Sequence, residues 1–293
     1  MRSSRLVSGS ITWPTAPNRL SAWSVPARRV AIRTAVAGAL IANAVLMISA
    51  WQGLLFGAAI PPDWQGLVDA ANRIASGADP YIGQTYGFRW SPLAAWLLVP
   101  VAAAGLFVWQ VLHVAALALL PRRLVIATLA CFAFWVDLAM GNVVLFGFVL
   151  AYVALSGRRS GVLAFTVFAL LIPRPLYVPI LLWLWLRERE NRRLMLGVAV
   201  AVAGLTLATG YAWTWLDILL KSGHDIVNAS NMAPSRIIGY AWVPLGWLGA
   251  VWAFRRGWLG VASLLASPYW LPYYFLMVLL DLSPRPATAS ASD

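Results

Sequence analysis

The run VAGALIANAVLMISAWQGLLF, residues 36–56, contains no charged residue. A helix needs about 20 mostly apolar residues to cross the hydrocarbon core of a bilayer. Arg28, Arg29 and Arg33 precede the run, and basic residues beside a span favour the cytoplasmic side. The run therefore predicts a transmembrane helix that begins at the cytoplasmic face.

The rest of the chain is also rich in apolar residues and poor in charged ones. Hydrophobic residues make up 61% of the 293 residues and charged residues 11%, whereas soluble domains usually carry about 25% charged residues. We see no short alternating strands of the kind that build a β-barrel. The sequence predicts an all-α, polytopic transmembrane bundle in one domain, residues 28–282. Taking about 20 residues per span as a guide, we expect about nine spans, near 36–56, 92–120, 124–140, 142–156, 161–173, 175–186, 194–215, 237–254 and 258–282.

The basic residues separate these apolar runs. The net charge is +12, but the arginines occur in short clusters typical of cytoplasmic loops. No basic face with interleaved aromatic residues is present, so nucleic acid is not an expected partner. We expect a plasma-membrane protein in contact with the lipid bilayer, with a flexible cytoplasmic tail at 1–27 and a disordered tail at 283–293. The single Cys131 excludes an internal disulfide and a cysteine-based metal site.

Two polar stretches, residues 57–91 and 216–236, fall on the non-cytoplasmic side in this topology. In the first stretch, apolar residues from Trp64 to Ile74 recur at helical spacing and Gly77 provides a stop. This pattern predicts a short amphipathic helix on the membrane surface. Five of the ten acidic residues lie in these two stretches: Asp63, Asp69, Asp79, Asp217 and Asp225. Chemistry that needs a carboxylate is therefore expected at the outer face.

Asp63 is the first candidate for such chemistry, because it follows Pro61-Pro62 directly after the first span. The prolines fix the backbone there. Partial desolvation at the boundary would raise the pKa of the carboxyl group and suit a general base. The structural alternative is that Asp63 caps the surface helix, and both roles are compatible.

A resemblance to a known family rests on short motifs. The main ones are DWQGLVDAANRIASGADPY at 63–81 and FRWSPL at 88–93. Weaker ones are Met140-Gly141-Asn142, Gly161, LIPRP at 171–175 and Ser267-Pro268-Tyr269. These motifs, and the order in which they follow one another along the chain, resemble the polyprenyl-phosphate-mannose-dependent α-mannosyltransferases. That family is glycosyltransferase family 87, which has the GT-C membrane fold. The chain departs from the family pattern at Arg174 and Asn142 and is shorter than is typical.

The resemblance implies a function. Asp63 would deprotonate a hydroxyl of a glycolipid or polysaccharide acceptor, which would attack a polyprenyl-phosphate sugar, with mannose the expected sugar, and invert the anomeric centre. No cofactor and no metal-ligand residue is expected, and a requirement for a divalent metal stays open. Because the leaving group is a phosphate, the site needs cations rather than an acid. The candidates for this role, all on the outer side, are Arg89, Arg174, Lys221, His224 and Arg236.

Each candidate has a plainer alternative. Arg174 lies between two prolines at a span end and could extend to the interface, and His224 could be an ordinary loop histidine. Trp64 and Trp90 are candidates for stacking on a sugar, or members of the aromatic belt. Further candidates for contacts with sugar or acceptor are Tyr81, Asn142 and Asp225.

Two polar residues lie inside predicted spans. His113 is expected to pack with its hydrogen bonds satisfied. Asp137 is a functional candidate because intramembrane carboxylates are costly, unless Asn142 or Arg174 neutralises it. Two other functions stay open: a lipid-sugar transporter or flippase, which would favour mid-membrane ionisable residues and repeated halves, and a non-catalytic membrane partner built on the same fold.

Overall fold

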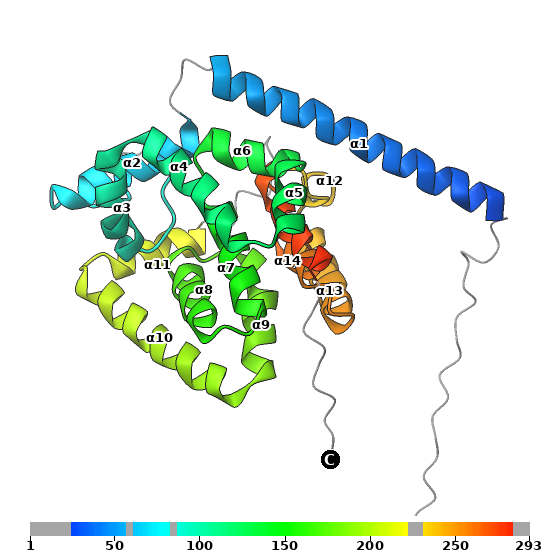
Figure 1. Ribbon diagram of the computed structural model, residues 1–293. Coiled ribbons are helices and arrows are strands. Elements are labelled where there is room, and N and C mark those ends of the chain that lie inside the picture. Colours follow the sequence, from blue (N-terminus) through cyan, green and yellow to red (C-terminus); the bar gives the residue numbers. More distant parts are fainter. Residues whose placement is uncertain (1–24, 57–60, 83–86, 222–230, 284–293) are drawn as a thin grey trace, which may run out of the picture. The chain divides into compact units, whose positions relative to one another are not determined.

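The computed structural model describes residues 25–56, 61–82, 87–221 and 231–283. Every regular element in these ranges is a helix and none is a strand (Figure 1). The chain divides into two units between Ala44 and Val45. The first unit contributes the N-terminal part of α1 (Val25–Phe56), and the second holds all the elements that follow. The predicted all-α class is confirmed.

In the part of the chain that the structure describes, three helical segments are long and apolar enough to cross a membrane: Ile32–Leu55, Arg189–Ala208 and Ser235–Arg255. Two further pairs of helices qualify only if each bent pair counts as one span, which gives up to five. The predicted number of nine is not confirmed, because several of the apolar runs form helices of only 10–17 residues.

Glycine breaks one of the predicted spans. Residues 92–120 form α3 (Pro92–Ala104) and α4 (Leu106–Ala116), which are bent by 110° at Gly105. Gly105 has φ +89°, a conformation that residues with a side chain rarely adopt. This segment is a broken span or a re-entrant loop rather than one continuous helix.

Other predicted spans are also divided. Residues 124–140 become α5 (Arg122–Leu129) and α6 (Phe132–Met140), bent by 73°. Residues 194–215 fall in α10 (Arg189–Ala208) and α11 (Ala212–Lys221), with Gly210 at φ +80° between them. The predicted span 258–282 is divided at Ser267-Pro268, between α14 (Leu259–Ala266) and the 3-10 helix η6 (Pro272–Leu282).

The main core lies where short helices meet. Helices α7 (Val144–Leu155) and α8 (Arg159–Leu171) pack side by side (Figure 1). Gly161 permits this approach, because a Cβ atom there would stand 2.7 Å from a backbone atom of Ala154. Around them lie further elements, including η3 (Pro175–Tyr177), α9 (Val178–Arg187) and η6. The remaining elements are η2 (Leu117–Leu119), α12 (Ser235–Ile238), η5 (Gly239–Ala241) and α13 (Trp242–Arg255).

Helix α2 (Pro62–Ala75) confirms the predicted amphipathic helix in the first polar stretch. Its apolar face, including Trp64, Leu67 and Ile74, is buried in a second core cluster with residues of α3. Protein side chains rather than lipid cover this face, and the position of the helix at the membrane surface stays a prediction. Packing on α3 fixes the direction in which the first turn of α2 presents its side chains.

Candidate functional site

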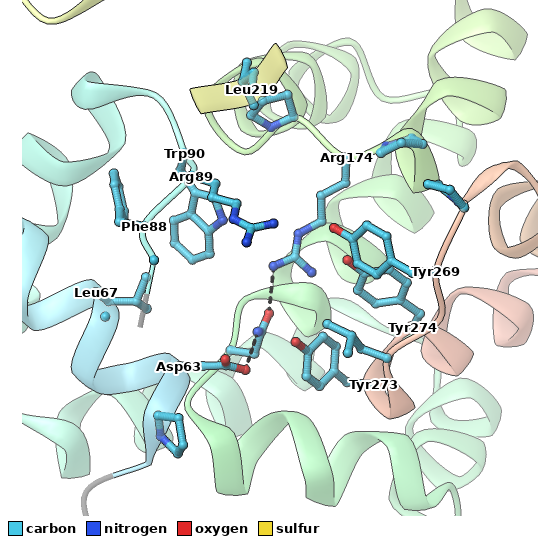
Figure 2. A pocket seen from close by; sticks show the side chains of 18 of the residues that line it. Asp63, Leu67, Phe88, Arg89, Trp90, Arg174, Leu219, Tyr269, Tyr273 and Tyr274 are labelled. Atoms are coloured by element: carbon cyan, nitrogen blue, oxygen red, sulfur yellow. Dashed lines mark hydrogen bonds between the residues drawn. The ribbon is translucent and has the colours of Figure 1, made fainter. Parts of the chain in front are cut away.

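A pocket of about 670 Å³ lies where the start of α2, the α6–α7 turn, the segment before η3 and the start of η6 converge. Figure 2 shows acidic, basic and aromatic side chains facing its interior. Its lining includes Asp63, Leu67, Phe88, Arg89, Trp90, Asn142, Arg174, Leu219, Tyr269, Tyr273 and Tyr274.

Asp63 lies in the first turn of α2 and is half-buried. The N-cap of this helix is Pro61, and no side chain caps it. The alternative that Asp63 caps the helix was therefore wrong. Its carboxylate instead accepts a 2.7 Å hydrogen bond from Nδ2 of Asn142. The carboxylate is thus directed into the pocket.

Asn142 links the acidic and basic parts of the site. Its Oδ1 accepts hydrogen bonds from the backbone N–H of Val143 at 2.7 Å and from Nη2 of Arg174 at 3.2 Å. A backbone N–H and a guanidinium can only donate, so the oxygen of the amide must face them. The amide nitrogen must then face Asp63. The orientation of Asn142 therefore follows from the chemistry of its neighbours.

The turn that carries Asn142 is held by its contacts. Gly141 adopts φ +67°, and a Cβ atom there would stand 2.7 Å from Cβ of Trp64. The backbone oxygen of Gly141 accepts a 2.9 Å hydrogen bond from Nε1 of Trp109. The Gly-Asn pair thus provides a close approach for α2 and, one residue later, the amide that binds Asp63.

Arg174 lies between Pro173 and Pro175 at the end of α8. Its Nη1 is enclosed and has no hydrogen-bond partner. Its guanidinium carbon lies 5.2 Å from the ring centroid of Tyr274 and 6.0 Å from that of Trp90, within the range of cation–π attraction. The predicted alternative, extension to the interface, was wrong, because the guanidinium is held inside the pocket. An enclosed, unpaired N–H group of this kind favours an anionic ligand.

A second cation faces the same space. Figure 2 shows the guanidinium groups of Arg89 and Arg174 pointing toward one another into the pocket. The backbone oxygen of Arg89 also accepts a 3.1 Å hydrogen bond from Nε1 of Trp215 in α11. Two guanidinium groups beside one cavity make its interior suitable for a doubly charged group such as a phosphate.

Burial raises the pKa of the Asp63 carboxyl group above its usual 3.8. The hydrogen bond from Asn142, the charge of Arg174 and a hydrogen bond from Tyr273 act in the opposite direction, and the charge of Asp137 adds a small further increase. Desolvation is the largest of these causes. A carboxylate with a raised pKa is a better proton acceptor than an exposed one.

Three pocket tyrosines were not predicted as site residues. Tyr269, Tyr273 and Tyr274 line the wall beside Arg174 (Figure 2), and Tyr273 and Tyr274 are buried. Their signal in the sequence is the run YWLPYY at 269–274, which places three hydroxyl groups in an otherwise apolar region. Leu219 and Leu220 of α11 add an apolar edge.

Some predicted residues lie beside the pocket rather than in its lining. Trp64 is buried under Gly141, and Tyr81 donates a 2.8 Å hydrogen bond to the backbone oxygen of Trp90. Lys221 is exposed and paired with Asp217 at 2.6 Å. Arg236 is exposed on α12. His224 and Asp225 fall outside the described residues.

The two polar residues of the predicted spans lie next to each other. His113 and Asp137 are fully buried, with Nε2 and Oδ2 3.5 Å apart. The carboxylate of Asp137 also accepts the backbone N–H groups of Val144 and Leu145. The expectation that His113 is packed and hydrogen-bonded is confirmed. The partners of the Asp137 carboxylate in the described part of the chain are His113 and these N–H groups rather than the side chain of Asn142 or Arg174.

Comparison of this chain with models of known protein families, with curated proteins and with solved structures finds no match. The geometry of the pocket is therefore what bears on the function of the chain. Within the described residues, no group of three or more His, Cys, Asp or Glu side chains is placed to hold a metal ion. The pocket does combine a desolvated carboxylate, guanidinium groups and aromatic walls.

Proposed function

We propose that the chain is an inverting membrane glycosyltransferase that moves a sugar, with mannose the expected one, from a polyprenyl-phosphate donor to a glycolipid or polysaccharide acceptor. The observation that carries the proposal is that Asn142 connects a carboxylate, Asp63, to a guanidinium with a free N–H edge, Arg174. Such a transfer needs a base for the acceptor and a cation for the departing phosphate.

In this proposal the reaction is one displacement. Asp63 takes the proton of the acceptor hydroxyl, whose oxygen forms a bond to the anomeric carbon as the bond from that carbon to the phosphate oxygen breaks. Arg174, with Arg89 beside it, binds the phosphate that leaves. The aromatic rings of Trp90 and Tyr269 provide faces on which a sugar can stack.

The membrane setting belongs to the same proposal. The apolar helices that could span a bilayer would hold the pocket near the lipid from which a polyprenyl chain must come. We propose that the pocket faces the outer side of the plasma membrane in a GT-C-like bundle with about nine crossings, short helices included, and a cytoplasmic N-terminus.

The decisive experiment uses purified protein with polyprenyl-phosphate-mannose and candidate acceptors, with mass spectrometry of the products. The variant Asp63→Asn should lose about 10²–10⁴-fold in transfer, the usual contribution of a general base. Asp69→Asn is the matched control, because Asp69 lies on the same helix, outside the pocket lining, where Gln65 donates to it. Full transfer by Asp63→Asn would exclude Asp63 as the base. Movement of lipid-sugar across proteoliposomes without a covalent product would indicate a flippase instead.

A further inference from the structure

His113, on α4, has hydrogen-bond partners at both ring nitrogens. Nδ1 lies 2.8 Å from the backbone oxygen of Trp109, and Nε2 lies 2.8 Å from the backbone oxygen of Asn142. Carbonyl oxygens only accept hydrogen bonds, and a neutral imidazole has a single N–H. A neutral ring would therefore leave one nitrogen lone pair facing a carbonyl lone pair. Only the doubly protonated ring satisfies both contacts.

The surroundings of the ring suit a positive charge. Asp137 of α6 is the charged group that faces it, with Oδ2 3.5 Å from Nε2, and both side chains are fully buried. A buried charge needs such a partner. From α7, Phe146 places its ring centroid 4.5 Å from the imidazole, within the distance for cation–π attraction.

The carboxylate of Asp137 has hydrogen-bond donors other than His113. Its two oxygens accept the N–H groups of Val144 at 3.2 Å and Leu145 at 3.0 Å. These groups belong to the first turn of α7, where the helix dipole also favours negative charge. The carboxylate is therefore stabilised as an anion independently of His113.

The pair is connected to the pocket through one residue. His113 binds the backbone oxygen of Asn142, and the backbone oxygen of Asp137 accepts the N–H of Asn142 at 3.0 Å. The side chain of the same asparagine binds Asp63 and Arg174. The backbone oxygen of Asn142 is thus held by the paired His113, and its N–H by the backbone of Asp137 at the end of α6; neither residue lines the pocket.

We infer that His113 is a buried imidazolium, paired with the Asp137 carboxylate, and that this ion pair positions Asn142 and through it Asp63 and Arg174. In this role His113 and Asp137 are positioning residues and touch no substrate. The protonation state stands on hydrogen-bond geometry alone, whereas the effect on transfer rests on the proposed function.

The protonation state can be measured directly, because the chain has two histidines. Full-length protein labelled with ¹⁵N-histidine in lipid nanodiscs should show His113 with two N–H protons at pH about 8, where an ordinary histidine is neutral. The variant His224→Ala assigns the signal. A ring that carries one proton in the unaltered protein would overturn the inference, and this result requires no transfer activity.

Asp137→Asn tests the pairing, since it should make His113 lose a proton. Asp281→Asn is the matched control: the Asp281 carboxylate accepts the N–H groups of Gly260 and Val261 at the start of α14, as Asp137 does for α7. The control should leave the His113 signal unchanged. Equal changes in both variants would contradict the pairing. If Asp137→Asn does not fold, the spectrum of the unaltered protein still decides the protonation state.

A double-mutant cycle tests the positioning role. His113→Gln should reduce sugar transfer by up to about 100-fold, as expected when reacting groups are misplaced, and should cause little further loss in an Asn142→Ala background. The same cycle is measured as binding of polyprenyl phosphate, which needs no transfer. If the losses caused by His113→Gln and Asn142→Ala simply add, both in sugar transfer and in the binding of polyprenyl phosphate, the positioning role is overturned. Absence of transfer by the unaltered protein, with coupling in binding, would count against the proposed function only.

Discussion

A Cβ atom at Gly141 would stand 2.7 Å from Cβ of Trp64, the residue that follows Asp63. The turn that presents Asn142 and the helix that presents Asp63 are therefore in contact at a point with room only for a hydrogen atom. Gly141→Ala should separate the two. It should cost about 1–2 kcal/mol for the left-handed backbone and about 1–3 kcal/mol more for overpacking, measured as the thermal midpoint of the solubilised protein.

Gly157→Ala isolates the first of these costs, the one for the left-handed backbone. Gly157 also has a positive φ, +86°, but a Cβ atom there would meet nothing within 4 Å. This variant should lose only the backbone contribution and keep full sugar transfer. Equal losses of stability in the two variants would show that the contact with Trp64 has no energetic weight.

The pH dependence of transfer follows from the raised pKa of Asp63. The base must be deprotonated, so transfer should increase as the pH rises through the raised pKa and then become constant. Asp63→Asn should lack this increase in any residual activity. Initial rates across the acidic range check the prediction, and an unchanged pH profile in Asp63→Asn would contradict it.

The stability of the folded protein should decrease over the pH range in which sugar transfer increases. Because the folded-state pKa of Asp63 is raised, its contribution to stability is present below the unfolded value of 3.8 and is lost as the pH rises through the folded-state pKa. Asp63→Asn should not show this decrease. Thermal midpoints of both proteins over the same pH range measure the difference.

Arg174→Lys should weaken the binding of polyprenyl phosphate although the charge is kept. Lysine cannot bind Asn142 and a phosphate through one planar group, and hydrogen bonds to charged groups contribute about 1.5–3 kcal/mol each. Titration with polyprenyl phosphate measures the loss. Arg236→Lys serves as the control, because this exposed arginine does not line the pocket. Equal effects of the two changes would argue against Arg174 as the phosphate site.

Tyr273→Phe should move the pH profile of transfer to higher pH. The hydroxyl group lowers the pKa of Asp63, so its removal should raise that pKa further. Sugar transfer by this variant should therefore be slower at mildly acidic pH and little changed at alkaline pH. Tyr152→Phe, a half-buried change on α7 away from the pocket, should leave the profile as it is.

The sequence was informative where a single residue carries a strong chemical signal. Asp63 after two prolines and Arg174 between two prolines were both predicted as site residues, and both line the pocket. The helical class followed from composition. The number of spans did not, because hydropathy does not register the positive φ of Gly105 or Gly210 that ends a helix inside an apolar run.

The contacts between distant residues were not predictable from spacing. His113 and Asp137 were recognised as buried polar residues, but their pairing depends on the bend between α3 and α4. The pocket tyrosines were not predicted as site residues, because tyrosine is common near membrane interfaces. Their role depends on the approach of η6 to α6 and α7, which no local pattern encodes.

The late position of the three pocket tyrosines in the sequence has a consequence for biosynthesis. Asp63 is made early, whereas Tyr269, Tyr273 and Tyr274 come from the last described part of the chain. While a ribosome is still adding the residues after α13, the pocket lacks one side. A nascent chain arrested at that stage would be inserted in the membrane without a closed binding site. The site would therefore become complete only when translation of the chain is complete.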